Sequence, residues 1–344
     1  MKRFLIVGAG LSGICVAERL LQRGVSVKVI DQVDQPSSTA VATGMYNPIV
    51  FKRLNKSWMA DELVAELRHF YRGLESKLGV QLLQDIEFKR CIPSQDYAVL
   101  WIQRLEDQAF QKFIGPISNG FGSVFESGIL DCELLVKSYV AHLVENDLLL
   151  NEAFIHDDLK VSTNHVTYKS QTYDGVVFCE GPYASKNPHF HWLPFKPCKG
   201  EWIIVQTDRA VTDVVVNDQI NIIPLGDNKY KLSSTYEWDD LTWNKTSKAA
   251  DELLAAFERI FKCNTKIIDQ QVGIRPSAAD RRPYIGSHPR QRNLHIFNGL
   301  GTKGIMLAPY FSEEFAAYLV EGKTLKDEIN IARHIKRYYQ EINS

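Results

Sequence analysis

The stretch RFLIVGAGLSGICVAERLLQRGVSVKVID, residues 3–31, decides the fold of this chain. Residues 4–7 are an apolar run of strand length, and the segment Gly8-Ala9-Gly10-Leu11-Ser12-Gly13 leads from them into a helical pattern. Residues 25–30 form a second apolar run, which Asp31 closes. This order of strand, glycine turn, helix and strand is typical of a dinucleotide-binding unit.

Each glycine of residues 8–13, hereafter the dinucleotide cradle, has a physical reason. Gly8 permits a tight turn, Gly10 lets the backbone approach a pyrophosphate, and Gly13 lets the helix close on the strand. Asp31, at the end of the second strand, is placed to accept hydrogen bonds from ribose hydroxyls. The cradle therefore predicts a bound NAD or FAD.

Length and charge limit the kind of partner. A chain of 344 residues predicts about two domains. Its 40 basic and 41 acidic residues give a formal net charge of -1, so no broad basic field favours nucleic acid, and we expect a small-molecule substrate.

No segment predicts a membrane span or a metal site. No apolar run approaches the ~18 residues that a transmembrane helix needs. Lys2 and Arg3 followed by residues 4–17 imitate a signal peptide, but that segment contains the cradle and no cleavage site, so we expect a cytoplasmic protein. The six scattered cysteines have no metal-ligand spacing and are expected to be free thiols.

The rest of the chain predicts an α/β fold with a second, α+β domain. Helical spacing occurs over residues 58–78, 131–144 and 248–261. Strand patterns occur at 87–92, 98–102, 123–125, 148–150, 176–179, 201–206, 212–216, 220–225, 229–234 and 267–274. We expect a Rossmann-like FAD/NAD(P)-binding domain of residues 1–85, 126–193 and 280–344, and an antiparallel-sheet substrate domain of residues 86–125 and 194–279.

Four glycine-centred segments favour a flavin dinucleotide over NAD. They are residues 8–13, 38–45, 179–182 and 299–304. A nicotinamide dehydrogenase, which Asp31 also permits, would need only the first, whereas an extended flavin needs several loops along its length. The last segment precedes a helix, whose N-terminus would stabilise negative charge on a reduced flavin ring.

Arg275 is the strongest side-chain candidate for substrate binding. It follows an apolar strand and precedes Pro276, so it lies at a strand end, where a guanidinium is able to clamp a carboxylate. A structural salt bridge is the alternative.

The chain resembles the FAD-dependent D-amino-acid oxidase superfamily, most closely its glycine-oxidase and sarcosine-oxidase-like branch. The resemblance covers nearly the whole chain. Its motifs, in chain order, are residues 8–13, Ala42-Thr43-Gly44-Met45, Lys199-Gly200-Glu201, Gly273-Ile274-Arg275-Pro276, Pro283-Tyr284-Ile285-Gly286 and Gly299-Leu300-Gly301-Thr302-Lys303-Gly304-Ile305.

This resemblance implies roles for individual residues. Arg275 would hold the substrate carboxylate, and Asn221 would lie in the substrate pocket. The FAD site would comprise Gly8, Gly10, Leu11, Ser12, Gly13, Asp31, Gln32, Ser38, Thr39, Thr43, Gly44, Met45, Ile155, Gly181, Gly299, Leu300, Gly301, Thr302, Lys303, Gly304 and Ile305.

Three departures from the family pattern bear on these roles. Asp31 stands where glutamate is more usual, and Asn221 stands where glycine oxidase has a tyrosine that binds the substrate carboxylate. Cys179 and Glu180 replace the small residues that commonly precede Gly181. No cysteine near residue 310 matches the flavin attachment of sarcosine oxidases, so we expect non-covalent FAD.

The reaction implied is oxidation of a small amine-bearing carboxylate, either an amino acid or an N-substituted glycine. Hydride would pass from Cα to flavin N5, the imine would be hydrolysed, and oxygen or another acceptor would reoxidise the flavin. Two alternatives of other kinds stay open. One is demodification of carboxymethylaminomethyl-uridine in tRNA, in which Lys52, Arg53 and Lys56 would meet RNA, and the other is a non-catalytic flavin redox sensor.

Overall fold

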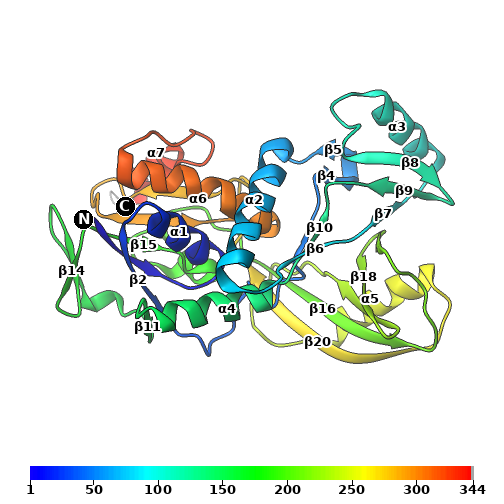
Figure 1. Ribbon diagram of the computed structural model, residues 1–344, viewed down its shortest axis with the longest axis horizontal. Coiled ribbons are helices and arrows are strands. Elements are labelled where there is room, and N and C mark those ends of the chain that lie inside the picture. Colours follow the sequence, from blue (N-terminus) through cyan, green and yellow to red (C-terminus); the bar gives the residue numbers. More distant parts are fainter. Residues whose placement is uncertain (342–344) are drawn as a thin grey trace.

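Two large sheets organise the molecule, one in each half of Figure 1. The computed structural model describes residues 1–341. The first sheet has the strand order β11 (Leu149–Asn151), β2 (Ser26–Asp31), β1 (Arg3–Val7), β15 (Gly175–Phe178), β22 (Leu294–Asn298) and β21 (Tyr284–Ser287). All neighbours are parallel except β21, which runs antiparallel to β22.

The register of the first sheet brings several strand ends to one edge. Val7 pairs with Ile30 on one side and with Phe178 on the other. Phe178 pairs in turn with Ile296 of β22. The segments that leave β1, β2, β15 and β22 therefore start side by side, which is where an open parallel sheet binds its ligand.

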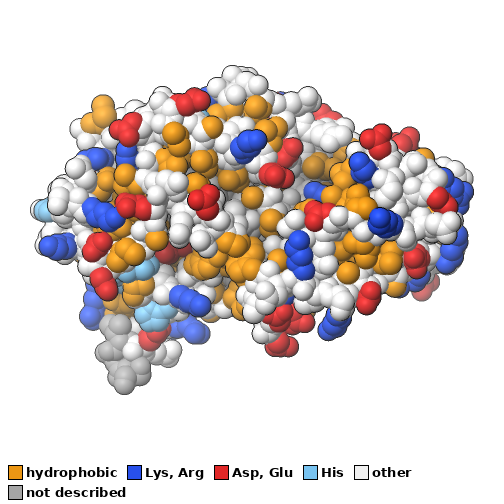
Figure 2. Space-filling model, turned by 90° about the horizontal axis from the view of Figure 1, so that it is seen from below, with side chains coloured by type: hydrophobic (Ala, Val, Ile, Leu, Met, Phe, Trp, Pro, Cys, Tyr) orange, Lys and Arg blue, Asp and Glu red, His pale blue; other side chains and the backbone are white. Residues whose placement is uncertain are grey.

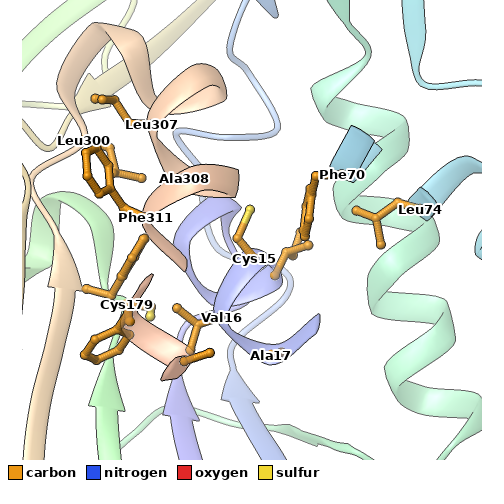
Figure 3. Packing of buried hydrophobic residues seen from close by; sticks show 14 of the residues in the cluster. Cys15, Val16, Ala17, Phe70, Leu74, Cys179, Leu300, Leu307, Ala308 and Phe311 are labelled. Carbon is orange, nitrogen blue, oxygen red and sulfur yellow. The ribbon is translucent and has the colours of Figure 1, made fainter. Parts of the chain in front are cut away.

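Helices cover one face of this sheet. They are α1 (Leu11–Gln22), α2 (Ala60–Leu78), α4 (Cys132–Glu145) and α6 (Gly304–Glu321). Figure 3 shows some of the apolar side chains between them, among which Cys15 of α1 lies beside Phe70 of α2. The predicted helix ends near residue 78 because Gly79 adopts φ +68° and closes α2.

A smaller layer covers the other face. It contains a three-stranded meander, three 3-10 turns and the last described helix, packed on a second apolar cluster. These elements are η2 (His156–Asp158), β12 (Leu159–Val161), β13 (Val166–Tyr168), β14 (Gln171–Tyr173), η3 (Gly181–Lys186), η5 (Ile331–His334) and α7 (Ile335–Glu341).

The second sheet is built from two distant parts of the chain. Its order is β20 (Thr265–Arg275), β16 (Cys198–Thr207), β19 (Lys229–Ser233), β18 (Asn221–Gly226), β17 (Val215–Asn217), β7 (Phe88–Cys91), β9 (Phe121–Val124) and β8 (Ile114–Ser118). The predicted antiparallel sheet is confirmed for all neighbours but β17 and β7, which are parallel. Helix α5 (Ser247–Ile260) covers one face of it through an apolar cluster.

Short strands connect the two sheets. One small sheet joins β3 (Met45–Tyr46), β10 (Gly128–Leu130) and β6 (Leu83–Asp85). A two-stranded ribbon joins β4 (Ile49–Val50) and β5 (Asn55–Lys56) around η1 (Phe51–Arg53).

The prediction of a strand over residues 98–102 is wrong, because this segment lies in α3 (Gln95–Glu106). The Ser94 hydroxyl accepts a hydrogen bond from the backbone N–H of Tyr97 at 3.2 Å and caps the helix. Trp101 is fully buried and anchors the helix on the second sheet. A short apolar run does not distinguish a strand from a buried helix, and here capping and burial decide.

The boundaries of the two-domain division stay a prediction. Residues 88–124 and 198–275 pair within one sheet, while the first sheet uses residues on either side of them. Within residues 1–341, no helix combines the length and the apolar character that a membrane crossing requires.

Candidate active site

The dinucleotide cradle lies at the edge where β1, β2 and β15 end together. Gly8 has φ +106°, and a Cβ built on it would lie 2.5 Å from the carbonyl oxygen of Cys179. A Cβ on Gly13 would overlap the carbonyl oxygen of Gly8. Only glycine fits these two positions, so the cradle lies as close to the sheet as two backbones allow.

The N-terminus of α1 is open to a ligand. Its N-cap is Gly10, which has no side chain to cap it. Leu11 N–H donates to Thr39 Oγ1 at 3.0 Å, and Ser12 is buried in the first turn. The helix dipole and the N–H groups of this turn favour an anion. Glycine spacing and an uncapped helix together fit the pyrophosphate of a dinucleotide.

Asp31 lies beside the cradle at the end of β2. Its Oδ2 accepts a hydrogen bond from Ala9 N–H at 3.1 Å, and its Oδ1 accepts one from Gln32 N–H at 3.0 Å. Burial raises the pKa of Asp31, although both hydrogen bonds act in the opposite direction. Each carboxylate oxygen keeps a lone pair for a ribose hydroxyl.

The loop of residues 38–45 joins the two sheets. Ser38 Oγ donates to the carbonyl oxygen of Ile274 in β20 at 2.6 Å. Trp202 Nε1 in β16 donates to the carbonyl oxygen of Val41, also at 2.6 Å. The loop is thereby fixed between the cradle and the second sheet.

Gly44 makes a close contact at the end of this loop. It has φ +76°, and a Cβ there would overlap the carbonyl oxygen of Leu130. Leu130 N–H donates to the carbonyl oxygen of Gly44 at 2.8 Å. Thr43 precedes this position and Met45 begins β3, so the predicted flavin-side residues lie on backbone held to β10.

Gly181 and Ile155 lie in the segments that follow β15 and precede η2. Gly181 has φ +56°, and its carbonyl oxygen accepts a hydrogen bond from Asn298 Nδ2 at 3.1 Å. Ile155 precedes η2, and its side chain is 46% exposed. Its N–H donates to the Tyr168 hydroxyl at 3.1 Å. This apolar side chain is available to cover a ring.

Residues 299–305 connect β22 to α6 and lie against the segment that follows β20. Leu300 forms an isolated β-bridge with Ser277. Gly301, with φ +56°, donates its N–H to the carbonyl oxygen of Pro276 at 3.2 Å. The segment predicted at the flavin edge therefore adjoins the end of the strand that carries Arg275.

The turn into α6 begins with η4 (Gly301–Lys303). Gly299 has φ +76°, Thr302 is exposed, and Gly304 and Ile305 are buried at the start of α6. No side chain caps this helix, so its first N–H groups are available to an electron-rich group.

Lys303 is the cation of this turn. Its Nζ donates to the carbonyl oxygen of Asn47 at 2.9 Å, and among residues 1–341 no carboxylate pairs with it. Burial lowers the pKa of Lys303 to about 8. The turn therefore holds a positive charge without an anionic partner, directed at the chain that follows residues 43–45.

Arg275 is the last residue of β20, as predicted. Its Nη2 donates to Ser234 Oγ at 2.7 Å and to the carbonyl oxygen of Thr235 at 3.1 Å. Its Nη1 lies 3.3 Å from the carbonyl oxygen of Lys199. In the described part of the chain no acidic side chain forms an ion pair with it, so the guanidinium charge is uncompensated.

Backbone and an aromatic ring both lie against this guanidinium. A Cβ built on Gly200 would overlap Nη2, so the guanidinium lies directly on the Gly200 backbone. The Tyr236 ring covers the guanidinium, with Cζ 4.5 Å from the ring centroid. Gly200 and Tyr236 therefore both restrict the position of the guanidinium, whose terminal nitrogens donate to neutral acceptors only.

Asn221 begins β18 and lies two strands away from β16. Its Oδ1 accepts a hydrogen bond from Asn217 Nδ2 at 2.6 Å. It is paired across the sheet with Ser233, which is paired in turn with Trp202. The Ser233 hydroxyl is buried and has no hydrogen-bond partner within the described residues. This face of the sheet carries a row of polar groups toward Trp202.

Ser234, Tyr236 and Trp202 are site residues that the sequence analysis missed. Trp202 was detectable, since it follows Gly200 by two residues and therefore shares its face of the strand. Ser234 and Tyr236 precede Arg275 by some forty positions and carry no pattern that links them to it.

Cysteines and metal ligands form no site of their own among residues 1–341. All six cysteines are free thiols, and no group of three or more His, Cys, Asp or Glu side chains is arranged to hold a metal. Burial raises the pKa of the Cys179 thiol well above its usual value, so this group beside the cradle stays protonated.

Known proteins match the chain along most of its length. The family model DAO, described as FAD dependent oxidoreductase, matches residues 3–318. A glycine oxidase of Bacillus subtilis is 22% identical over 89% of this chain and 89% of its own. A tRNA 5-methylaminomethyl-2-thiouridine biosynthesis bifunctional protein MnmC of Legionella pneumophila is 22% identical over 83% of this chain but only 45% of its own.

Solved structures share the fold. The iminodiacetate oxidase of Chelativorans sp. BNC1 superposes with a TM-score of 0.75 at 21% identity, covering 96% of this chain and 98% of that one. The glycine oxidase of Bacillus cereus ATCC 14579 gives a TM-score of 0.72 at 19% identity, covering 94% and 96%.

Proposed function

This chain belongs to the DAO family of FAD-dependent oxidoreductases, and we propose that it oxidises the C–N bond of a small amine-bearing carboxylate. As a member of that family it is an enzyme that uses FAD. The family therefore favours FAD over the NAD-dependent alternative, and an enzyme over the non-catalytic sensor.

The dinucleotide cradle and three loops would hold FAD along its length. The proposed contacts, in chain order, are Gly8, Gly10, Leu11, Ser12, Gly13, Asp31, Gln32, Ser38, Thr39, Thr43, Gly44, Met45, Ile155, Gly181, Gly299, Leu300, Gly301, Thr302, Lys303, Gly304 and Ile305. The last cysteine of the chain is Cys263, far from the start of α6, so the binding is proposed to be non-covalent. When bound, FAD supplies a two-electron acceptor.

Arg275 would bind the substrate carboxylate, and this assignment rests on its uncompensated charge. A carboxylate arriving at the guanidinium edge would replace the Ser234 hydroxyl and the Thr235 carbonyl as acceptors. Arg275 would then donate to one charged, bidentate acceptor in place of two neutral acceptors, and hydrogen bonds to a charged acceptor are stronger. The carboxylate would then hold the amine and Cα of the substrate in one orientation.

Positive charge on the turn of residues 299–305 would support electron uptake. Lys303 and the uncapped N-terminus of α6 both lie on the turn that adjoins Pro276. Fixed positive charges placed where negative charge develops lower the energy of the charged state. The residues of this chain thus orient the substrate at Arg275 and stabilise charge at the turn of residues 299–305.

Named relatives support this substrate class. One relative is named glycine oxidase, and a structural neighbour is named iminodiacetate oxidase. Both names denote oxidation of compounds that carry an amino or imino nitrogen and a carboxylate.

The direct test is an anaerobic bleaching screen of the purified holoenzyme. Glycine, sarcosine, iminodiacetate and D- and L-amino acids would be mixed with the protein, and the loss of the visible flavin absorbance would be recorded. We expect bleaching by at least one of them, with a 2-oxo acid or glyoxylate as the product after reoxidation. Absence of bleaching by every member of the panel would contradict the proposal.

Oxidation of a carboxymethylaminomethyl group in tRNA is a second candidate, favoured by the match to MnmC over 83% of this chain. That group is itself an N-substituted glycine, so Arg275 would serve the same purpose. Lys52 and Arg53 are exposed on η1, whereas Lys56 forms an ion pair with Asp61. On the face drawn in Figure 2, basic and acidic side chains are interspersed.

Salt-dependent binding distinguishes this candidate. If tRNA is the substrate, the double variant Lys52→Glu with Arg53→Glu should bind tRNA more weakly. The slope of log K against log salt concentration should also become shallower, by an amount that corresponds to about two fewer phosphate contacts. Equal, weak tRNA binding by the double variant and the unaltered protein would reject it.

A further inference from the structure

Two charged residues that the proposed reaction does not use are buried beside the substrate-binding arginine. Lys199 and Glu201 flank Gly200 in β16 and are 1% and 2% exposed. Alternate residues of a strand face opposite sides of a sheet, so both side chains point away from the face on which Gly200 contacts the guanidinium of Arg275. Burial this complete is costly for a charge unless a partner compensates it.

Lys199 finds its partner in the chain that follows β19. Its Nζ donates to Asp240 Oδ2 at 2.5 Å and lies 3.9 Å from Glu201 Oε1. The backbone N–H groups of Lys199 and Glu237 each donate to the carbonyl oxygen of the other residue, at 2.8 and 2.9 Å. Side chain and backbone of Lys199 therefore hold the same piece of chain.

Glu201 holds both ends of that chain, residues 235–246. Its N–H donates to Thr235 Oγ1 at 3.0 Å, and its carboxylate accepts hydrogen bonds from the N–H and the hydroxyl of Thr246 at 2.9 and 2.8 Å. Gln270 Nε2 also donates to this carboxylate, at 2.7 Å. The segment of residues 235–246 is thus tied to β16 at its start, its middle and its end.

The start of this segment lies against the guanidinium of Arg275. The carbonyl oxygen of Thr235 accepts a hydrogen bond from Nη2 at 3.1 Å, and the centroid of the Tyr236 ring is 4.5 Å from Cζ. Glu237, which is bound to Lys199, is the next residue. A displacement of the chain at Glu237 would therefore move two neighbours of the guanidinium.

We infer that Lys199 is a positioning residue for the substrate-binding guanidinium. Its ion pair with Asp240 fixes the segment of residues 235–246, and this segment holds Arg275 in the orientation that receives the substrate carboxylate. The inference rests on the proposed function and adds to it a residue that does not touch the substrate. Gly200 thus gives the guanidinium its space on one face of β16, and Lys199 fixes its neighbours from the other face.

Lys199→Met tests the inference in the holoenzyme, because methionine retains an unbranched apolar chain and removes the charge. The variant should fold, since the Asp240 side chain is 40% exposed and Glu201 keeps its other hydrogen bonds. Asp240→Asn breaks the same ion pair from the exposed side and is the second variant. Lys77→Met, which breaks an ion pair of 2.6 Å with buried Glu18, is the matched control.

KM and kcat are measured with the best carboxylate of the bleaching screen and with its carboxamide. We expect Lys199→Met to raise KM for the carboxylate roughly three- to thirtyfold, and to change kcat and the carboxamide KM by less than about twofold. Asp240→Asn should act in the same direction, and Lys77→Met should change neither KM. A merely structural loss would lower the amount of active enzyme, and hence kcat, equally for both compounds.

A double variant tests whether Lys199 acts through the segment. Tyr236→Leu removes the ring from the guanidinium and should also raise KM for the carboxylate. The effect of Lys199→Met combined with Tyr236→Leu should fall short of the product of the two single effects by at least about threefold. Single effects that multiply would mean that Lys199 acts independently of Tyr236, and would overturn the inference.

The outcomes separate this inference from the proposed function. Turnover with a carboxylate KM that is unchanged in Lys199→Met, or raised equally for the carboxamide, would overturn the inference and leave the proposed function standing. Carboxylate binding that alters the flavin spectrum and depends on Lys199, without turnover of any amine, would support the positioning role and contradict the proposed function. Neither turnover nor spectral binding of any carboxylate would contradict both.

Discussion

The guanidinium of Arg275 occupies the space that a side chain on Gly200 would fill. The two residues lie on adjacent strands, β20 and β16, and a Cβ on Gly200 would overlap Nη2 of Arg275. The Lys199-Gly200-Glu201 motif and the Gly273-Ile274-Arg275-Pro276 motif are therefore two halves of one arrangement. The glycine is required so that the cation can lie flat on the strand.

Gly200→Ala should displace the guanidinium without removing it. We expect kcat/KM to fall by about 10- to 100-fold, because a small misplacement of a substrate-orienting group is costly, while FAD content stays normal. Gly73→Ala, at an open position on α2, is the matched control and should keep full activity. Unchanged kcat/KM in Gly200→Ala would mean that the position of Arg275 does not matter to the reaction.

Arg275→Ala should raise KM by about 10- to 100-fold, the worth of a hydrogen bond to a charged group. Arg275→Lys should recover only part of this, because an ammonium lacks the planar fork. Arg282→Ala removes a guanidinium stacked on Trp58 and serves as the control. Steady-state kinetics with each variant measure the effect, and a normal KM in Arg275→Ala would refute the clamp.

Gly13→Ala should weaken FAD binding about tenfold or more, since the new methyl group overlaps the Gly8 carbonyl and forces the cradle open. The dissociation constant is measured by titrating the apoprotein with FAD and following flavin fluorescence. Affinity equal to that of Gly73→Ala would show that the cradle tolerates a side chain and does not approach the cofactor closely.

His295 should make the protein sensitive to acid. It is buried in β22, its Nδ1 lies 2.7 Å from Ser287 Oγ, and burial lowers its pKa from 6.5 to about 3. The unfolded chain binds a proton below pH 6.5 while the folded chain stays neutral. Its contribution to stability is thus complete above pH 6.5 and is lost as the pH falls toward 3, by up to about 1.4 kcal/mol per pH unit.

His295→Gln should therefore show a shallower loss of unfolding free energy between pH 6.5 and 4.5, measured by urea denaturation with excess FAD. Exposed His165→Gln should retain the slope of the unaltered protein. If His295→Gln and the unaltered protein lost stability at the same rate, the histidine would not be the acid-sensitive group.

The cradle could be predicted from the sequence because its determinants are local. Gly8, Gly10 and Gly13 are set by backbone conformation and close approach, and the apolar runs on either side specify parallel strands buried on both faces. The position of Arg275 at a strand end could also be predicted from the sequence, since an apolar strand precedes it and a proline follows.

The surroundings of Arg275 could not be predicted, because they depend on the register of the second sheet. Ser234, Tyr236 and Gly200 reach the guanidinium through strands that are distant in sequence. The parallel pairing of β17 with β7 is likewise a long-range result that no local pattern specifies. In α3 the local pattern was misleading, because its apolar run is typical of a strand. Burial of Trp101 and the Ser94 cap stabilise a helix there instead.

The most direct test of the account is the rate at which an amine carboxylate and its carboxamide reduce the bound flavin in the absence of oxygen. Stopped-flow mixing with the best carboxylate of the screen and with the matching carboxamide isolates the interaction assigned to Arg275. The account predicts that the carboxylate bleaches the flavin rapidly. The concentration that gives half of the maximal reduction rate should be at least about tenfold higher for the carboxamide, and Arg275→Ala should remove this difference. Equal bleaching by both compounds in the unaltered enzyme would contradict it.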